Sequence, residues 1–262
     1  MQQFLFLTVS LLASVAGAIC GIGGGVIIKP VLDLFGLASV STISFLSGCT
    51  VLSMSAYSVG KGLISRDSAV DLKSGTYLAV GAAVGGVCGQ QLFALVRGLF
   101  ENQDTVGAVQ AACLFVITLG TLVYTIRKAN IRTIRVQGAA PGVLIGLALG
   151  VMSSFLGIGG GPINLAVLYY FFSMDTKTAA LNSLYIILFS QGASFLNTIL
   201  RGTVPEFQWP VLIVMVIGGI VGGTLGRSIS KRLSNSGVDR LFFWLLIAIT
   251  GISCYNLVRC FV

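Results

Sequence analysis

Two clusters of glycine are the residues in this sequence whose type and spacing point to chemistry. One runs from Gly157 to Gly161 as Gly-Ile-Gly-Gly-Gly and is followed by Pro162, and the same five letters occur 136 residues earlier, at 21–25. Each cluster interrupts an apolar stretch of helical character, because glycine loses the most backbone entropy on ordering and tolerates positive φ. Backbone broken inside a membrane must line a cavity or be buried in protein, since lipid cannot satisfy its polar groups. Two breaks at matching positions indicate the binding site of a transporter.

Consecutive glycines ahead of a helix leave backbone N–H groups free at its positive end, which attracts anions without a charged side chain. Proline at the first helical position, as at Pro162, fits such a start. The glycines predicted to bind an anion are Gly23, Gly24, Gly25, Gly159, Gly160 and Gly161. Because the two clusters are paired, alanine at Gly24 is expected to act like alanine at Gly160. The alternative is that the glycines only allow close helix packing.

Polar residues on segments expected to face the glycines extend this predicted site. Asn182 and Ser183 open the helix after the second short arm, and Ser47 has the position of Ser183 in the first half. Their amide and hydroxyl groups can donate neutral hydrogen bonds to an oxyanion, although helix–helix hydrogen bonding explains the serines equally well. Lys29, about one helical turn beyond Gly25, is a candidate cationic partner of the substrate, with snorkelling to the interface as the alternative.

Composition places the chain in the membrane. Of its 262 residues 55% are hydrophobic and 9% are charged, whereas a soluble domain carries about 25% charged residues. The net charge of +8 comes from basic residues between apolar spans, so the positive-inside rule explains it and nucleic acid is not an expected partner. The chain has no histidine, and its six cysteines lack metal-type spacing. We therefore expect no enzyme activity, no metal and no cofactor.

The positions of the acidic residues bear on the charge of the substrate. All eight lie in or next to loops, and none is placed in the middle of an apolar span. Cation transporters and proton relays usually place carboxylates within the membrane. The sequence therefore favours an anionic or neutral substrate.

Ten apolar runs divide the chain, and most have the 17–25 residues that a membrane helix needs. They are roughly 4–20, 25–36, 41–60, 72–97, 106–126, 137–156, 161–174, 178–200, 209–229 and 239–259. A second glycine-rich match, 81–86 with 218–223, has an offset of 137 residues, so the two halves are repeats. The sequence predicts one transmembrane domain over 1–262, with repeat one at about 1–126, a linker at about 127–136 and repeat two at about 137–262.

The direction of the second repeat follows from the basic residues. If each glycine break lay inside one straight span, the sixteen Lys and Arg would divide nine to seven between the two sides. If the arms before and after the glycines are antiparallel, they divide twelve to four, a clear positive-inside bias. That arrangement has about five helical elements per repeat, and the odd number inverts the second repeat. The predicted fold is an all-α integral membrane protein of two inverted repeats with glycine-broken helices and both termini outside.

These features resemble the sulfite exporter TauE/SafE family of membrane permeases. The resemblance rests on the duplicated Gly-x-Gly-Gly-Gly, on Pro30 after the first copy, on the segments that end in Ser47 and Ser183, and on the glycine-basic turn at 61–64. It covers about residues 5–260. It implies transport of sulfur-containing anions, such as sulfite, sulfoacetate or other organosulfonates, across a bacterial plasma (inner) membrane.

We therefore expect a multi-pass exporter or permease that works by alternating access between its repeats, with a small anion and the lipid bilayer as partners. The alternatives are a facilitator of another small anion such as a carboxylate, and a membrane sulfur-relay protein that uses Cys20 and Cys49. The second half departs from the family pattern at Ala166, which stands where the first half has Pro30, and at Asn182. The exact anion, the direction of transport, the coupling ion and the oligomeric state, a homodimer included, stay open.

Overall fold

The computed structural model describes residues 2–64, 72–100 and 103–259. Within these residues the chain forms ten α-helices, one short 3-10 turn (η1, Lys128–Asn130) and no strand. The helices are α1 (Gln2–Cys20), α2 (Gly25–Phe35), α3 (Val40–Ile64), α4 (Leu72–Leu99), α5 (Gln103–Arg127), α6 (Ala139–Leu156), α7 (Gly161–Phe172), α8 (Thr176–Leu200), α9 (Trp209–Arg232) and α10 (Asn235–Arg259). Each predicted apolar run corresponds to one helix, and eight of the helices are long and apolar enough to cross a membrane. The all-α membrane fold is confirmed.

The two short helices begin at the glycine breaks, as the sequence predicts. α2 has 11 residues and α7 has 12, so each is about 16–18 Å long, roughly half of the hydrocarbon thickness of a bilayer. α7 carries Pro162 in its first turn, and α6 is capped at its C-terminus by Gly157, whose φ of 65° is left-handed. The breaks therefore lie at membrane depth inside the protein.

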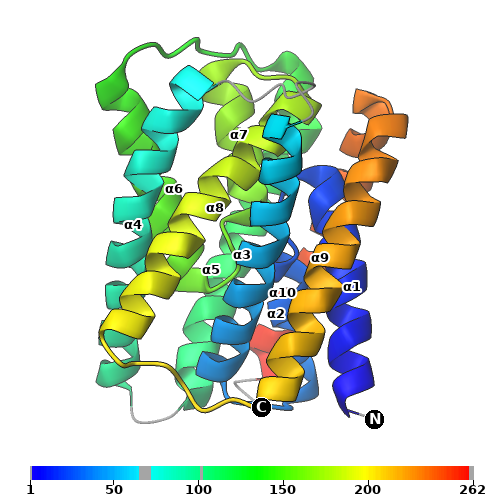
Figure 1. The fold of residues 1–262 in the computed structure, drawn as a ribbon. Coiled ribbons are helices and arrows are strands. Elements are labelled where there is room, and N and C mark those ends of the chain that lie inside the picture. Colours follow the sequence, from blue (N-terminus) through cyan, green and yellow to red (C-terminus); the bar gives the residue numbers. More distant parts are fainter. Residues whose placement is uncertain (1, 65–71, 101–102, 260–262) are drawn as a thin grey trace.

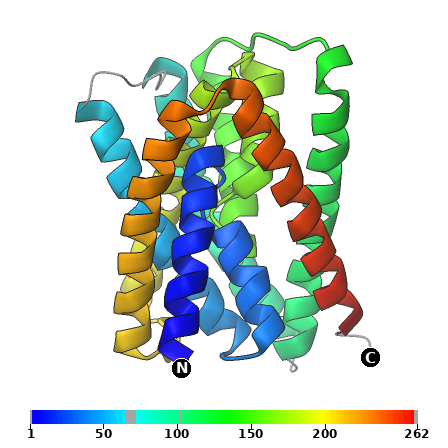
Figure 2. The same cartoon turned by 90° about the vertical axis from the view of Figure 1, so that its right-hand side faces the viewer.

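The arms on either side of each break are antiparallel. The N–H groups of Ile134 and Val136, in the segment that leads into α6, donate to the carbonyl oxygens of Tyr170 and Phe171 at the end of α7, both at 2.8 Å. The start of α6 and the end of α7 therefore lie at the same end of the molecule (Figure 1). Figure 2 shows α1 rising from the N-terminus and α2 returning toward it.

Corresponding helices of the two halves run in opposite directions. In Figure 1, α3 rises from the lower end and α8 descends to it, and in Figure 2 both chain ends lie at the lower end. This arrangement is compatible with two inverted repeats.

Glycine-rich helices form the closest packing, and the same contacts recur in both halves. α4 packs on α6, and α9 packs on α1. A Cβ on Gly85 would lie 2.2 Å from the carbonyl oxygen of Leu147, and a Cβ on Gly222 would lie 2.6 Å from that of Leu11. A helix can approach a backbone so closely only where it has no side chain. Gly222 is a packing residue.

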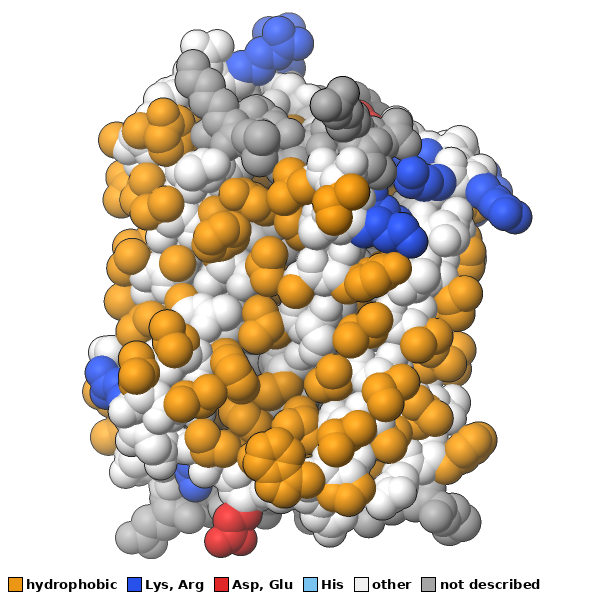
Figure 3. All heavy atoms as spheres, in the orientation of Figure 1, with side chains coloured by type: hydrophobic (Ala, Val, Ile, Leu, Met, Phe, Trp, Pro, Cys, Tyr) orange, Lys and Arg blue, Asp and Glu red, His pale blue; other side chains and the backbone are white. Residues whose placement is uncertain are grey.

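The outer surface has a hydrophobic middle and a basic upper end (Figure 3). Lys61 lies in the last turn of α3, Arg127 ends α5, and Lys231 and Arg232 lie at the end of α9. All three helices end at the top of Figure 1. By the positive-inside rule, this end is predicted to face the cytoplasm.

Sidedness can be tested with single cysteines in a cysteine-free background. We expect Asn130→Cys and Asn235→Cys, which are exposed at the basic end, to react with an impermeant thiol reagent from the cytoplasmic side of the membrane. Glu206→Cys, in the exposed loop at the other end, serves as the control and should react from the opposite side. Reaction of positions 130 and 235 from opposite sides would contradict this arrangement.

Candidate functional site

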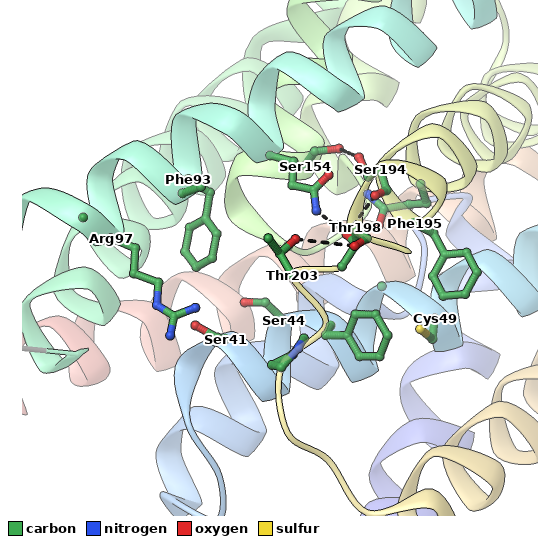
Figure 4. Close-up of a pocket in the computed structure, with 18 residues that line it drawn as sticks. Ser41, Ser44, Cys49, Phe93, Arg97, Ser154, Ser194, Phe195, Thr198 and Thr203 are labelled. Carbon is green, nitrogen blue, oxygen red and sulfur yellow. Dashed lines mark hydrogen bonds between the residues drawn. The ribbon is translucent and has the colours of Figure 1, made fainter. Parts of the chain in front are cut away.

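A cavity of about 420 Å³ lies among helices α3, α4, α6 and α8 (Figure 4). A volume of this size is typical of small-molecule sites. Its lining residues are Ser41, Ser44, Phe45, Gly48, Cys49, Gln90, Phe93, Ala94, Arg97, Gly98, Ser154, Gly157, Gln191, Ser194, Phe195, Thr198, Thr203 and Pro205. None of these residues is acidic.

Hydroxyl and amide groups on the cavity wall are joined across three helices. The Ser194 hydroxyl, on α8, donates to the carbonyl oxygen of Gly86 on α4 at 2.9 Å and lies 2.6 Å from the hydroxyl of Ser154 on α6. Gln90 Nε2 donates to Thr198 Oγ1. These bonds fix the wall and keep several donors at the cavity surface.

Ser44 and Gln191 extend the polar wall toward the inner end of the cavity. The buried hydroxyl of Ser44 has no hydrogen-bond partner among the described residues. Gln191 is 5% exposed, and its Nε2 donates to Ser153 Oγ at 3.1 Å. A buried hydroxyl is costly without a partner, so Ser44 is suited to bind a ligand.

Arg97 is the one charged side chain on the lining. It lies in the last turn of α4, and Figure 4 shows its guanidinium turned toward Ser41 and Ser44. Arg97, Ser41 and Pro205 also line an adjoining hollow that contains one carboxylate, Glu206. The cavity is therefore entered from the end of the molecule that holds both termini.

The inner end of the cavity reaches the second glycine break. A Cβ on Gly157 would lie 2.8 Å from the Cβ of Ser44. The same contact recurs in the first half, where a Cβ on Gly21 would lie 2.4 Å from the Cβ of Ala180. Each glycine break therefore packs on the helix that follows the short arm of the other half.

The six predicted binding glycines are brought together beyond this inner end, and none of them lines the cavity. A Cβ on Gly25 would lie 2.5 Å from the carbonyl oxygen of Ile158, and a Cβ on Gly161 would lie 2.2 Å from Val26 Cγ2. Gly23 faces the side chains of Val51 and Ile187, and so does Gly159. Close packing of the two breaks explains the glycines at 23, 25, 159 and 161, whereas Gly24 lies against Ser14 and Gly160 against Asn164. Their part in binding stays a prediction.

The paired glycines differ in backbone conformation, which bears on the expectation that their alanine variants act alike. Gly160 has a φ of 89°, whereas Gly24 has a φ of −64° and is right-handed helical. A Cβ on Gly160 would also lie 2.8 Å from Asn164 Nδ2. The backbone is therefore strained for alanine at Gly160 and not at Gly24. At Gly24 a Cβ would instead be crowded, 3.0 Å from Ser14 Oγ and 3.1 Å from the Ser14 backbone nitrogen, so both substitutions are unfavourable for different reasons.

The predicted polar residues lie apart from the cavity lining. Ser47 and Ser183 are fully buried, and their hydroxyls have no hydrogen-bond partner in the described part of the chain. The amide of Asn182 donates to the carbonyl oxygen of Thr178 in its own helix at 2.8 Å. Lys29 is 3% exposed and forms an ion pair with Asp33 at 2.8 Å. Their part in substrate binding stays a prediction.

Sequence reasoning missed most of the cavity. Neither Arg97 nor Gln191 is among the residues that the sequence predicts to bind the substrate. One signal was present, since Gln191, Ser194 and Thr198 are spaced three and four residues apart and so share one face of α8. A polar stripe on an otherwise apolar helix indicates a lined cavity or a helix contact.

Comparison with known proteins agrees with the membrane fold. The family model for the sulfite exporter TauE/SafE matches residues 6–253. The chain is 25% identical to the probable membrane transporter protein YunE of Bacillus subtilis, over 95% of this chain and 96% of that protein.

Two further similarities are partial. The chain is 30% identical to a probable membrane transporter protein of Xylella fastidiosa over 40% of each chain. It is 25% identical to the probable membrane transporter protein MamO of Magnetospirillum gryphiswaldense, over 86% of this chain and 40% of that protein. No solved structure matches the chain. Because the family model spans nearly the whole chain, this multi-pass membrane protein belongs to the sulfite exporter TauE/SafE family of transporters.

Proposed function

We propose that this transporter moves a small sulfur-containing anion, such as sulfite, sulfoacetate or another organosulfonate, through the cavity among α3, α4, α6 and α8. The observation that carries the proposal is the cavity lining, which combines hydroxyl and amide donors with Arg97 and includes no acidic residue. A sulfonate presents three oxygens that share one charge. A planar guanidinium with neighbouring neutral donors suits such a group.

The apolar part of the lining supports an organic anion. Phe45, Phe93 and Phe195 face the cavity, and the rings of Phe45 and Phe195 stack with their centroids 6.1 Å apart. A short carbon chain beside the sulfonate would remove apolar surface of these rings from water. Sulfoacetate and related organosulfonates fit this division into a polar and an apolar wall.

Transport would proceed by alternating access between the two halves of the protein. In the present state the cavity is entered from the end that holds the termini, and Gly157 and Ser44 lie at its inner end. The two glycine breaks, with Val51 and Ile187, lie beyond it. The positive ends of α2 and α7 meet at these breaks, so they would attract an anion in transit when the breaks separate. This is the role that we propose for Gly23–Gly25 and Gly159–Gly161.

Ligand-dependent thermal stability tests the charge of the substrate. We expect methanesulfonate and sulfoacetate at millimolar concentration to raise the melting temperature of the purified protein, because a ligand that binds only the folded state stabilises it. Exchange of sodium for potassium at constant anion should change nothing. Cation-specific stabilisation would contradict an anion site, and equal stabilisation by acetate would favour a carboxylate facilitator.

The same assay separates the sulfur-relay alternative. Cys49 lines the cavity, and Cys20 is fully buried. A cavity that binds the anion through hydrogen bonds should keep its affinity when both cysteines are replaced by serine. Loss of binding in that variant would instead favour a relay through the thiols.

A further inference from the structure

A buried polar group on α3 and α9 corresponds to the polar wall of the cavity. The sequence offsets of 136 and 137 residues relate Gln191 to Ser55, Ser194 to Ser58, and Gln90 to Arg227. Contacts follow the same relation. Gln90 on α4 bonds Thr198 on α8, and Arg227 on α9 lies against Gly62 on α3, the counterpart of Thr198. The cavity wall thus has an inverted counterpart near the basic end of the molecule.

This counterpart is buried and polar. Ser55, Ser58 and Arg227 are 0%, 1% and 9% exposed. The hydroxyls of Ser55 and Ser58 have no hydrogen-bond partner among the described residues. Hydroxyl groups buried without partners are costly, and ionisable residues within membrane spans are typically functional. Two unpartnered hydroxyls beside a buried guanidinium therefore indicate that a ligand binds here in another state of the protein.

In the present state the side chain of Arg227 occupies the space beside Ser58. Its Nη1 donates to the carbonyl oxygen of Ser58 at 2.5 Å, and a Cβ on Gly62 would lie 3.0 Å from the same nitrogen. The guanidinium thus links α9 to α3 at a point where the corresponding helices α4 and α8 border the open cavity.

Helix α3 takes part in both regions. Ser44 and Gly48 line the cavity, and Ser55 and Ser58 lie farther along the same helix, toward the basic end. Val51, which packs beneath both glycine breaks, lies between the two sets. An anion that follows α3 would therefore meet hydroxyl donors on both sides of one apolar barrier.

We propose that Ser55, Ser58 and Arg227 form a second binding position for the transported anion, which opens toward the basic end when the cavity closes. The proposal rests on the proposed function, because it assigns the same substrate to both positions. Arg227 has two roles in it. It closes the pathway through the Ser58 carbonyl in the present state, and it supplies the cation of the site in the opposite state, as Arg97 does in the cavity.

Thiol labelling with anion protection tests this proposal. Ser58→Cys and its inverted counterpart Ser194→Cys are placed singly in a cysteine-free chain, in right-side-out and inside-out membrane vesicles. The probe anion is methanesulfonate, which does not react with the thiol reagent. We expect Ser194→Cys to react from the side of the chain termini and Ser58→Cys only from the side of the basic end, with methanesulfonate slowing both reactions.

Replacing Arg227 separates its two roles. In an Arg227→Gln background, Ser58→Cys should react about tenfold faster or more, because the link to the Ser58 carbonyl is lost, and methanesulfonate should no longer protect it. Arg227→Lys keeps a cation and should retain part of the protection. If the role of Arg227 were purely structural, its replacement would not change the protection of Ser58→Cys by methanesulfonate. The two variants are compared only when the protein extracted from the vesicles is monodisperse. Where Arg227→Gln does not fold, Arg227→Lys is used alone.

The outcomes distinguish this proposal from the proposed function. Protection of Ser194→Cys without protection of Ser58→Cys overturns the second position and leaves the cavity assignment intact. If Ser58→Cys reacts from neither side, whether residue 227 is arginine or glutamine, the second position is also overturned. Absence of protection at Ser194→Cys would instead count against the anion cavity itself.

Discussion

Arg97→Ala should weaken the binding of methanesulfonate by about ten- to a hundredfold, because a hydrogen bond to a charged group is worth about 1.5–3 kcal/mol. Arg97 is the one charged residue on the cavity lining, and its guanidinium is turned into the cavity. It is exposed and makes no hydrogen bond or ion pair within the described residues. The melting temperature without ligand should therefore stay nearly unchanged. Isothermal titration calorimetry and thermal melts measure both quantities.

Arg201→Ala is the matched control for this change. Arg201 is an exposed arginine at the same end of the molecule, and its Nε donates to Asn197 Oδ1 at 3.1 Å, but it does not line the cavity. Its removal deletes the same charge without deleting a cavity donor. Arg97→Lys should give an intermediate affinity, since lysine keeps the charge and loses the planar fork. Equal losses in the Arg97 and Arg201 variants would reduce the role of Arg97 to long-range attraction.

Gly85→Ala and Gly222→Ala should each lower the melting temperature by about 2–12 °C, since overpacking costs about 1–3 kcal/mol and each 1 kcal/mol shifts a chain of this size by about 2–4 °C. The added methyl would lie 2.2 Å from the Leu147 carbonyl oxygen in one case and 2.6 Å from the Leu11 carbonyl oxygen in the other. Backbone atoms cannot move aside as a flexible side chain can. The helix pair must separate instead.

Gly120→Ala controls for the methyl itself. Gly120 lies in α5, and a Cβ there meets no atom within 4 Å. Alanine is a better helix former than glycine by about 1 kcal/mol, so the melting temperature should stay the same or rise. Anion affinity should be unchanged in all three variants that fold. A stable Gly222→Ala protein would show that α9 and α1 are not packed as closely as described.

The helical plan was predictable from sequence because a membrane imposes it. Lipid requires long apolar runs, and it permits broken backbone only inside protein, so the ten runs and the two breaks indicate the elements directly. The twelve-to-four distribution of basic residues also predicted antiparallel arms at each break, and the bonds from Ile134 and Val136 to the end of α7 confirm them in the second half. Constraints that act on the whole chain in this way can be recognised in a single sequence.

The site was harder to predict because membrane helices are apolar on all sides. In α8 polar residues face both the cavity and neighbouring helices, so Asn182 and Gln191 could not be distinguished without knowing which helix packs on which face. Asn182 bonds within its own helix, and Gln191 lines the cavity. Lys29 was one of an i, i+4 pair with Asp33, a spacing that already favours an ion pair within the helix.

The two glycine breaks have the same sequence but differ in backbone conformation. Both read Gly-Ile-Gly-Gly-Gly, but proline follows the second and Val26 the first. Proline disfavours the right-handed helical conformation in the residue before it, and Gly161 has a φ of 39°. The neighbouring Gly160 is left-handed too, whereas Gly24 is helical. Identical motifs therefore adopt different backbones at their last two glycines.

Counterflow in proteoliposomes tests the central claim most directly. Vesicles that contain the purified protein are loaded with unlabelled sulfoacetate and diluted into a trace of radiolabelled sulfoacetate, with empty vesicles and the Arg97→Ala variant as controls. We expect transient accumulation of label in vesicles with the unchanged protein, inhibition by external sulfite and methanesulfonate, and little inhibition by acetate. Absence of accumulation for sulfoacetate and for sulfite, or accumulation that acetate abolishes equally well, would contradict transport of a sulfur-containing anion through this cavity.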